Sequence, residues 1–153
     1  MSFPSTESYP TFQSVTVGDE LPPLVVPLTR TLIVATAIAS RDYQEVHHDH
    51  EVAQSRGSQD IIMNILTTNG FVGRFITDWA GPDALIRSVK IRLGAPNYPG
   101  DTMTLTGAVT ATTPADANGQ WAGTVTIAVR GANSLGDHVN ATVEVGLLGS
   151  ATR

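Results

Sequence analysis

Hydrophobic and polar residues alternate along the second half of the chain. Apolar side chains recur at alternate positions in four stretches, which are Leu85–Leu93, Thr102–Ala111, Trp121–Val129 and Val139–Leu147. A period of two is typical of β-strands with one buried and one solvated face. Segments rich in turn-forming residues separate these stretches, at residues 95–101, 114–119 and 133–137. The pattern therefore predicts four consecutive antiparallel strands with one wet face.

The first forty residues contain one short strand and one short helix. Residues 1–20 are rich in Ser, Thr and Pro without periodicity, which predicts a flexible or loosely docked N-terminal arm before a domain spanning residues 21–150. Pro27 restricts the apolar run Leu24–Leu28 to an edge strand or a strand entrance, because proline has no N–H to donate. Thr31–Ser40 predicts a short helix.

A long helix is predicted in the most apolar part of the chain, Ile61–Trp79. Apolar residues occupy most of its sides, which is typical of a helix buried in the centre of a domain. Asn64 is a candidate N-cap, and Gly81-Pro82 closes the C-terminal end.

The order of these elements predicts an α+β fold. One leading strand, a polar helical region, a long helix and four strands leave the long helix as the element that covers the apolar face of the sheet. An antiparallel sheet wrapped around a single central helix is the hot-dog fold. Such a domain leaves a sheet edge and a helix surface for a partner, so we expect an oligomer.

Composition narrows the function classes. The 153 residues include no cysteine, and nine Lys and Arg against 14 Asp and Glu give a net charge of −5. Without a basic stripe to neutralise phosphates, nucleic-acid binding is not expected. The longest apolar stretch, Leu32–Ala39, is too short to span a bilayer, and residues 1–14 lack the pattern of a secretory signal. We expect a soluble, cytoplasmic protein without a metal or other cofactor.

Candidate chemistry is concentrated in the polar segment Arg41–Gln59, which carries three of the four histidines. Asp42 and His47 are two titratable groups five residues apart, a pair suited to general acid–base catalysis, although a solvated acidic turn would have the same composition. The adjacent residues His47 to His50 do not predict a metal site, because consecutive side chains diverge. His138 falls in a predicted strand and is expected at the surface.

This segment resembles the hydratase motif of the MaoC-like (R)-specific enoyl-CoA hydratases. That motif has the pattern S-G-D-x-N-P-x-H-x-D, and residues 40–49 read S-R-D-Y-Q-E-V-H-H-D. Asp42, His47 and Asp49 match, whereas Arg, Gln and Glu replace the Gly, Asn and Pro of the motif. Asn64-Ile65-Leu66 stands where the family has H-G-M, and Tyr98–Thr102 resembles its P-G-D-T turn.

The resemblance implies an activity and a site. Asp42 and His47 would activate water for addition to an enoyl-CoA and relay the proton. The backbone amide of Ile65 would stabilise the enolate oxygen, with Asn64 as a helix cap, a hydrogen-bond donor or both. Gln44 and Asp49 are further candidate substrate-binding residues.

Within this family, the sequence resembles the small catalytic subunit of heteromeric hydratases that act on steroid side chains. This resemblance implies a second MaoC-like subunit as partner in a heterodimer or heterotetramer, with a homodimer as the alternative. Two other functions stay open. One is a hot-dog acyl-CoA thioesterase, for which Asp78 is the carboxylate on the long helix. The other is a non-catalytic acyl-CoA-binding or scaffold subunit of a hydratase or aldolase complex.

Overall fold

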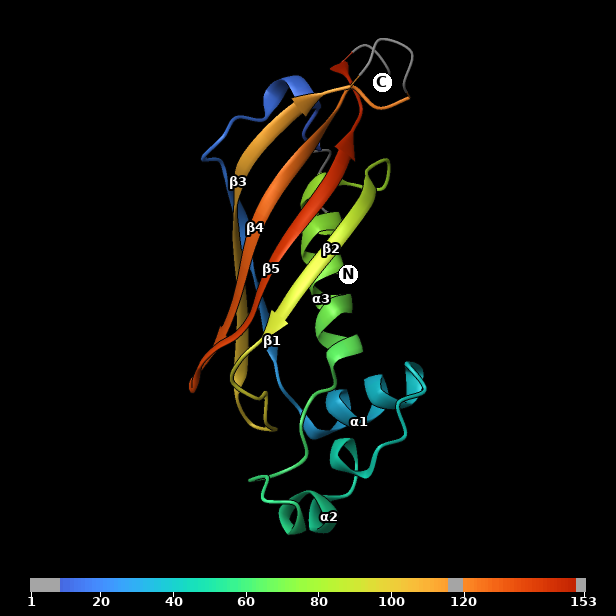
Figure 1. Cartoon of the computed structure of the whole chain (residues 1–153), viewed down its shortest axis with the longest axis vertical. Helices are drawn as coiled ribbons and strands as arrows, with labels where there is room; N and C mark the ends of the chain where they lie inside the picture. Colours follow the sequence, from blue (N-terminus) through green and yellow to red (C-terminus); the bar gives the residue numbers. More distant parts are fainter. Residues whose placement is uncertain (1–8, 116–119, 151–153) are drawn as a thin grey trace, which may run out of the picture.

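The computed structural model describes residues 9–115 and 120–150, which form one antiparallel sheet and three α-helices (Figure 1). The five strands lie in the order β1-β3-β4-β5-β2. They are β1 (Glu20–Pro27), β2 (Leu85–Leu93), β3 (Thr102–Pro114), β4 (Gly123–Asn133) and β5 (Gly136–Leu147). The helices are α1 (Arg30–Ala39), α2 (His50–Ser55) and α3 (Ile65–Ala80), with short 3₁₀ turns η1 (Phe12–Ser14) and η2 (Glu45–His47).

Strand β1 lies at one edge of the sheet, as Pro27 predicts. It begins earlier than the apolar run, at Glu20, and its pairing with β3 is irregular between Leu21 and Leu24. The two prolines between these residues, Pro22 and Pro23, have no N–H for the ladder, so the irregularity falls where the sequence cannot supply donors.

Helix α3 lies against the sheet, and its apolar face builds the core with the inward-facing residues of all five strands (Figure 1). Phe75 is the largest fully buried side chain, and its ring lies against Gly107 of β3. A Cβ at position 107 would come within 2.9 Å of the ring, so glycine is the residue that permits this close packing. The α+β hot-dog architecture predicted from the sequence is therefore confirmed.

The prediction that α3 is buried on most sides is wrong for the chain by itself. The face opposite the sheet is exposed, and it includes the apolar residues Ile65 and Leu66. A single sheet covers one side of a helix, so the apolar side chains on the other side remain uncovered by this chain. Asn64 does cap the helix, and Gly81 ends it with a φ of 85°.

The described part of the predicted N-terminal arm contacts the sheet where β5 ends. Phe12 packs against the core, and its N–H donates to the carbonyl of Leu148 at 3.0 Å. Residues 1–8 lie outside the described residues. No helix among the described residues is long and apolar enough to cross a membrane.

The prediction that His138 lies at the surface is also wrong, because its side chain is 2% exposed. The pairing of β5 with β4 shifts where Gly131 and Ala132 oppose Val139 and Asp137, which makes His138 the extra residue of a bulge. The bulge turns both His138 and Val139 inward and so breaks the alternation of the strand. The His138 ring bonds the Ala95 carbonyl at 2.6 Å and the Thr68 hydroxyl of α3 at 2.8 Å.

Burial lowers the pKa of His138 from 6.5, which makes a pH-dependent contribution to stability. Between pH 6.5 and the lower folded-state pKa, the unfolded chain binds a proton at His138 that the folded chain does not bind, so the unfolding free energy falls as the pH falls. We expect His138→Gln to lose about 1–3 kcal/mol at pH 8, because one buried hydrogen bond is broken. Its unfolding free energy is expected to depend less on pH below 6.5. Urea unfolding between pH 5 and 8 measures both effects, and parallel pH curves for the two proteins would contradict the prediction.

Candidate active site

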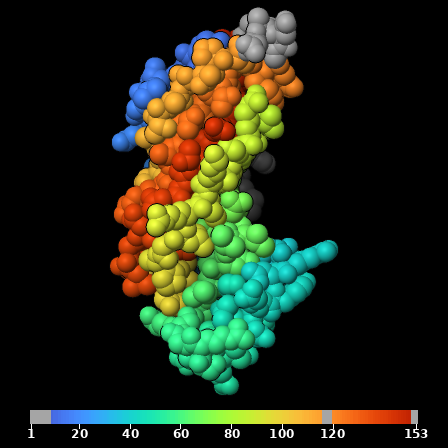
Figure 2. Space-filling view, viewed as in Figure 1, coloured from blue at the N-terminus to red at the C-terminus, as the bar shows by residue number. Residues whose placement is uncertain are grey.

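The motif segment follows α1 at the end of the molecule where α1, α2 and the N-terminus of α3 meet. In Figure 2 residues 30–60, coloured cyan to green, form a lobe beyond the end of the sheet. Helix α1 is capped by the Thr29 side chain, which accepts from the Leu32 N–H at 3.0 Å. After the helix, the N–H of Asp42 donates back to the Ala37 carbonyl at 2.9 Å. This bond fixes the backbone position from which the Asp42 side chain extends.

Asp42 and His47 lie side by side. The distance between the Asp42 Oδ2 and the His47 Nε2 is 3.3 Å, and the side chains are 18% and 9% exposed. The other ring nitrogen, Nδ1, lies 2.7 Å from the backbone carbonyl of Ile62. Because a carbonyl oxygen can only accept, Nδ1 carries a proton, and Nε2 is left facing Asp42 as the position at which a proton can be exchanged.

Asn64 joins the N-terminus of α3 to this pair. Its Oδ1 accepts from the Thr67 N–H at 2.9 Å, which caps the helix. Its Nδ2 donates to the Ser40 hydroxyl at 2.8 Å and to the Asp42 Oδ2 at 3.1 Å. The structure confirms Asn64 as the helix cap, and it shows the amide of Asn64 donating to Ser40 and Asp42. The buried side chain therefore orients the Asp42 carboxylate.

We expect Asn64→Asp to slow any proton transfer at the pair without unfolding the helix. Aspartate is as good an N-cap as asparagine, so the helix is retained. Its carboxylate cannot donate to Asp42 Oδ2, and two like charges at this distance repel each other, so the bond that orients the Asp42 carboxylate is lost. The rate of proton transfer is expected to fall about tenfold or more, because a small misplacement of a reacting group has a cost of this order. An unchanged rate in a folded variant would contradict this role of Asn64.

Ile65 is the first residue of α3, directly after the cap. No carbonyl of a helix accepts from the N–H of its first residue, and the helix dipole makes this end favourable for an anion. The Ile65 side chain is 50% exposed, so it is not part of the packed core. The amide can thus face a developing oxyanion although glycine is absent.

Comparison with known proteins identifies the family. Residues 13–130 match the family described as MaoC like domain. The chain is 50% identical over 131 residues to the beta subunit of 3-oxo-4,17-pregnadiene-20-carboxyl-CoA hydratase from Mycobacterium tuberculosis. The aligned region covers 86% of this chain and 95% of that subunit. This chain belongs to the MaoC-like family.

Two solved structures show the same fold as this MaoC-like chain. The ChsH1-ChsH2 complex from Mycobacterium tuberculosis contains a chain that is 50% identical, with a TM-score of 0.78 over 86% of this chain and 98% of that one. The R-hydratase PhaJ1 from Pseudomonas aeruginosa is 19% identical, with a TM-score of 0.78 over 92% of this chain and 86% of that one.

Arg41 is the residue of this MaoC-like chain that replaces the glycine of the motif. Its φ is 58°, in the left-handed region where glycine is favoured. A glycine would adopt this conformation without strain, whereas Arg41 bears about 1–2 kcal/mol of conformational cost for it.

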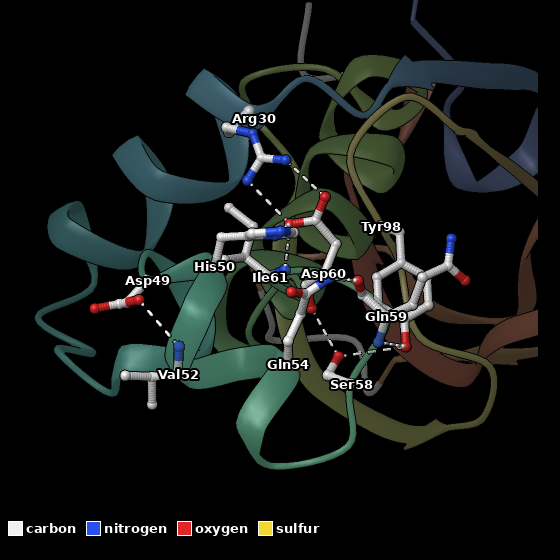
Figure 3. Close-up of polar contacts among 10 residues, drawn as sticks. All are labelled: Arg30, Asp49, His50, Val52, Gln54, Ser58, Gln59, Asp60, Ile61 and Tyr98. Carbon is white, nitrogen blue, oxygen red and sulfur yellow. Dashed lines mark hydrogen bonds and ion pairs between the residues drawn. The ribbon is translucent and has the colours of Figure 1, made fainter.

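The other two predicted site residues support the segment locally. Asp49 caps α2 by accepting from the Val52 N–H at 3.1 Å (Figure 3). Gln44 precedes the η2 turn, and its backbone carbonyl accepts from the His47 N–H at 3.0 Å. Among the described residues, neither side chain forms a hydrogen bond with Asp42 or His47. The structure thus brings together Asp42, His47 and Asn64 beside the Ile65 amide, with Gln44 and Asp49 at the turns that hold them.

An apolar groove of about 350 Å³ runs between α1 and α3 next to this site. It is lined by Thr36, Ala39, Ser40, Leu66, Thr67, Gly70, Phe71 and Arg74. Ser40 belongs to both the groove and the hydrogen bonds around Asp42. No pattern in the sequence indicates the groove or the role of the Ile62 carbonyl, apart from Ser40, which lines the groove and is the first residue of the matched motif.

Among residues 9–115 and 120–150, no group of three or more His, Asp or Glu side chains is arranged to hold a metal ion. The two histidines that follow His47 in the sequence are not grouped with it around a common site. His50 pairs with Asp60 at 2.9 Å, and His48 is exposed.

Proposed function

We propose that this MaoC-like chain is the catalytic subunit of an enoyl-CoA hydratase, which adds water across the α,β double bond of an enoyl-CoA thioester. The observation that carries the proposal is the 3.3 Å approach of His47 Nε2 to Asp42 Oδ2 beside the first amide of α3. A proton-exchanging pair next to an anion-stabilising amide is the arrangement that this addition requires.

The reaction moves one hydroxide and one proton onto the substrate. A water molecule between Asp42 and His47 loses a proton to the pair and attacks Cβ. Electrons of the double bond move onto the thioester oxygen, and the resulting enolate is stabilised by the Ile65 N–H and the positive end of α3. A proton from the pair then reaches Cα. The two residues act as a coupled unit that supplies both the base and the acid.

We further propose that the substrate is a steroid side-chain enoyl-CoA and that a second MaoC-like subunit completes the enzyme. The 50% identity to the pregnadiene-carboxyl-CoA hydratase beta subunit and to a chain of a two-component complex supports both parts. The exposed apolar residues Ile38, Tyr43 and Leu66 lie on the elements that carry the site, where a partner or a large apolar substrate would cover them. The proposed location is the cytoplasm, since a chain without cysteine needs no oxidising compartment.

The geometry favours hydration over thioester hydrolysis. The carboxylate that a thioesterase would use on the long helix is Asp78, which lies near the opposite end of α3 from Asn64. Asp78 is largely exposed and pairs with Arg74 at 3.2 Å. Among residues 9–115 and 120–150, its ion-pair partner is an arginine, whereas Asp42 lies beside the imidazole of His47.

The decisive experiment follows the loss of enoyl-thioester absorbance with the purified chain, alone and with the co-expressed second subunit. A short enoyl-CoA and a steroid enoyl-CoA are compared. Turnover of the steroid substrate by the complex supports the proposal, and turnover by the lone chain supports a self-sufficient hydratase. Release of free CoA thiol from a saturated acyl-CoA without hydration would indicate a thioesterase. Calorimetric binding without turnover by the complex would indicate a scaffold subunit.

A further inference from the structure

Asp60 binds three separate elements around the active-site segment. Its carboxylate accepts two bonds from the Arg30 guanidinium at the start of α1, at 2.9 Å and 2.6 Å (Figure 3). It also accepts from Nδ1 of His50, the first residue of α2, at 2.9 Å. A fourth bond, at 2.7 Å, comes from the N–H of Ile61 on the approach to α3. One side chain thus connects α1, α2 and the segment that leads into α3.

These contacts differ from an ordinary surface ion pair. The Asp60 side chain is 19% exposed, and the fork of Arg30 meets both carboxylate oxygens, which adds geometric definition to the charge attraction. Hydrogen bonds from Arg30, and then from His50 and Ile61, hold the pKa of Asp60 well below its usual range. Asp60 is therefore ionised throughout the pH range in which the enzyme would work.

The segment that Asp60 holds carries the acceptor for the catalytic histidine. Ile61, bonded to the Asp60 carboxylate through its N–H, is fully buried. The carbonyl of the next residue, Ile62, accepts a hydrogen bond from His47 Nδ1 at 2.7 Å. The N–H of Ile62 donates to the Val46 carbonyl at 3.0 Å. The direction of the Ile62 carbonyl thus depends on a backbone that Asp60 anchors two residues earlier.

We propose that Asp60 is a positioning residue for the hydration reaction. With Arg30 and His50 it fixes the Ile61–Ile62 backbone, so that the Ile62 carbonyl keeps His47 in the tautomer with the proton on Nδ1 and Nε2 directed at Asp42. This inference rests on the proposed hydratase function for its kinetic consequence. The effect on the His47 tautomer follows from the geometry and is independent of any reaction.

The test uses Asp60→Asn, which keeps the shape of the side chain and removes its charge, in whichever form hydrates the enoyl-CoA. We expect kcat to fall about 10–100-fold, because a small misplacement of a reacting group has a cost of this order. KM is expected to stay within about twofold, since Asp60 lies outside the groove. Arg30→Lys keeps the positive charge but cannot donate to both Asp60 oxygens at once, so we expect a smaller loss of kcat. Arg56→Gln breaks the exposed Arg56–Glu45 pair on the same segment and serves as the matched control with unchanged kcat.

The tautomer is measured separately by ¹⁵N NMR of the histidine rings in the full-length protein. We expect the wild type to show His47 protonated on Nδ1 and Asp60→Asn to show a population protonated on Nε2. An unchanged His47 spectrum and kcat in folded Asp60→Asn would overturn the positioning role. A loss of kcat that matches the loss of folded protein in a melting curve would also overturn it. A wild type without hydratase activity would instead overturn the proposed function and leave the tautomer measurement as the test of Asp60.

Discussion

Replacement of Asp42 by asparagine is expected to lower the kcat of hydration by about 10²–10⁴-fold, the range that a positioned acid or base contributes. Asparagine has the same shape as aspartate, and its oxygen can still accept from Asn64 Nδ2, so the bond between residues 42 and 64 persists. What it cannot do is take up or release a proton. The loss is therefore expected in kcat, with KM and the melting temperature close to those of the wild type.

The matched control for this change is Asp78→Asn, which neutralises an exposed carboxylate on α3. It is expected to retain wild-type hydration, and it also removes the carboxylate on which a thioesterase would depend. Absorbance assays on the two variants, each with the second subunit present, measure the difference. Wild-type kcat in Asp42→Asn would contradict the assignment of Asp42 to the reacting pair.

Replacement of His47 by glutamine is expected to lower kcat over the same range of about 10²–10⁴-fold. Glutamine is polar and of similar length, but its amide does not exchange a proton near neutral pH. The larger consequence concerns the double variant with Asp42→Asn. Because the proposed mechanism has both residues act on one water molecule, removal of the second group is expected to lower kcat by less than about tenfold beyond the loss in either single variant.

His48→Gln provides the control for the histidine, because His48 is adjacent in sequence and exposed. Its kcat is expected to equal that of the wild type. A double-mutant cycle over wild type, the two single variants and the double variant measures the coupling. Losses that multiply in the double variant would show that Asp42 and His47 act in separate steps, against the shared-water mechanism.

Much of the fold could be predicted from local patterns. The period of two over Leu85–Leu93 and Val139–Leu147 predicted strands that the structure has as β2 and β5. Asn64 and Gly81 predicted the two ends of α3, because capping depends on residues close along the chain. The failures occurred where a neighbour distant in sequence decides the outcome. The bulge opposite Gly131 buries His138, and a single sheet leaves one side of α3 uncovered.

The same division holds for the candidate site. The motif match selected Asp42 and His47, and the N-cap position of Asn64 followed from the apolar run behind it. The acceptor of the His47 proton could not be predicted, since it is a backbone carbonyl fifteen residues away, and any residue type would supply one. The contact of Asp60 with Arg30 joins residues thirty apart in a stretch of ordinary surface composition.

By itself, then, the sequence determined the strands, the long helix with its cap, and the two residues suited to proton transfer. Periodicity and capping are properties of adjacent residues, so they can be interpreted without knowing how the elements pack. Only the tertiary structure decided that Asp42 and His47 approach to 3.3 Å, that Asn64 donates to the carboxylate, and that the Ile62 carbonyl bonds the imidazole. These distances depend on where α1, α2 and α3 meet, and that meeting point is set by the packing of the whole domain around the sheet.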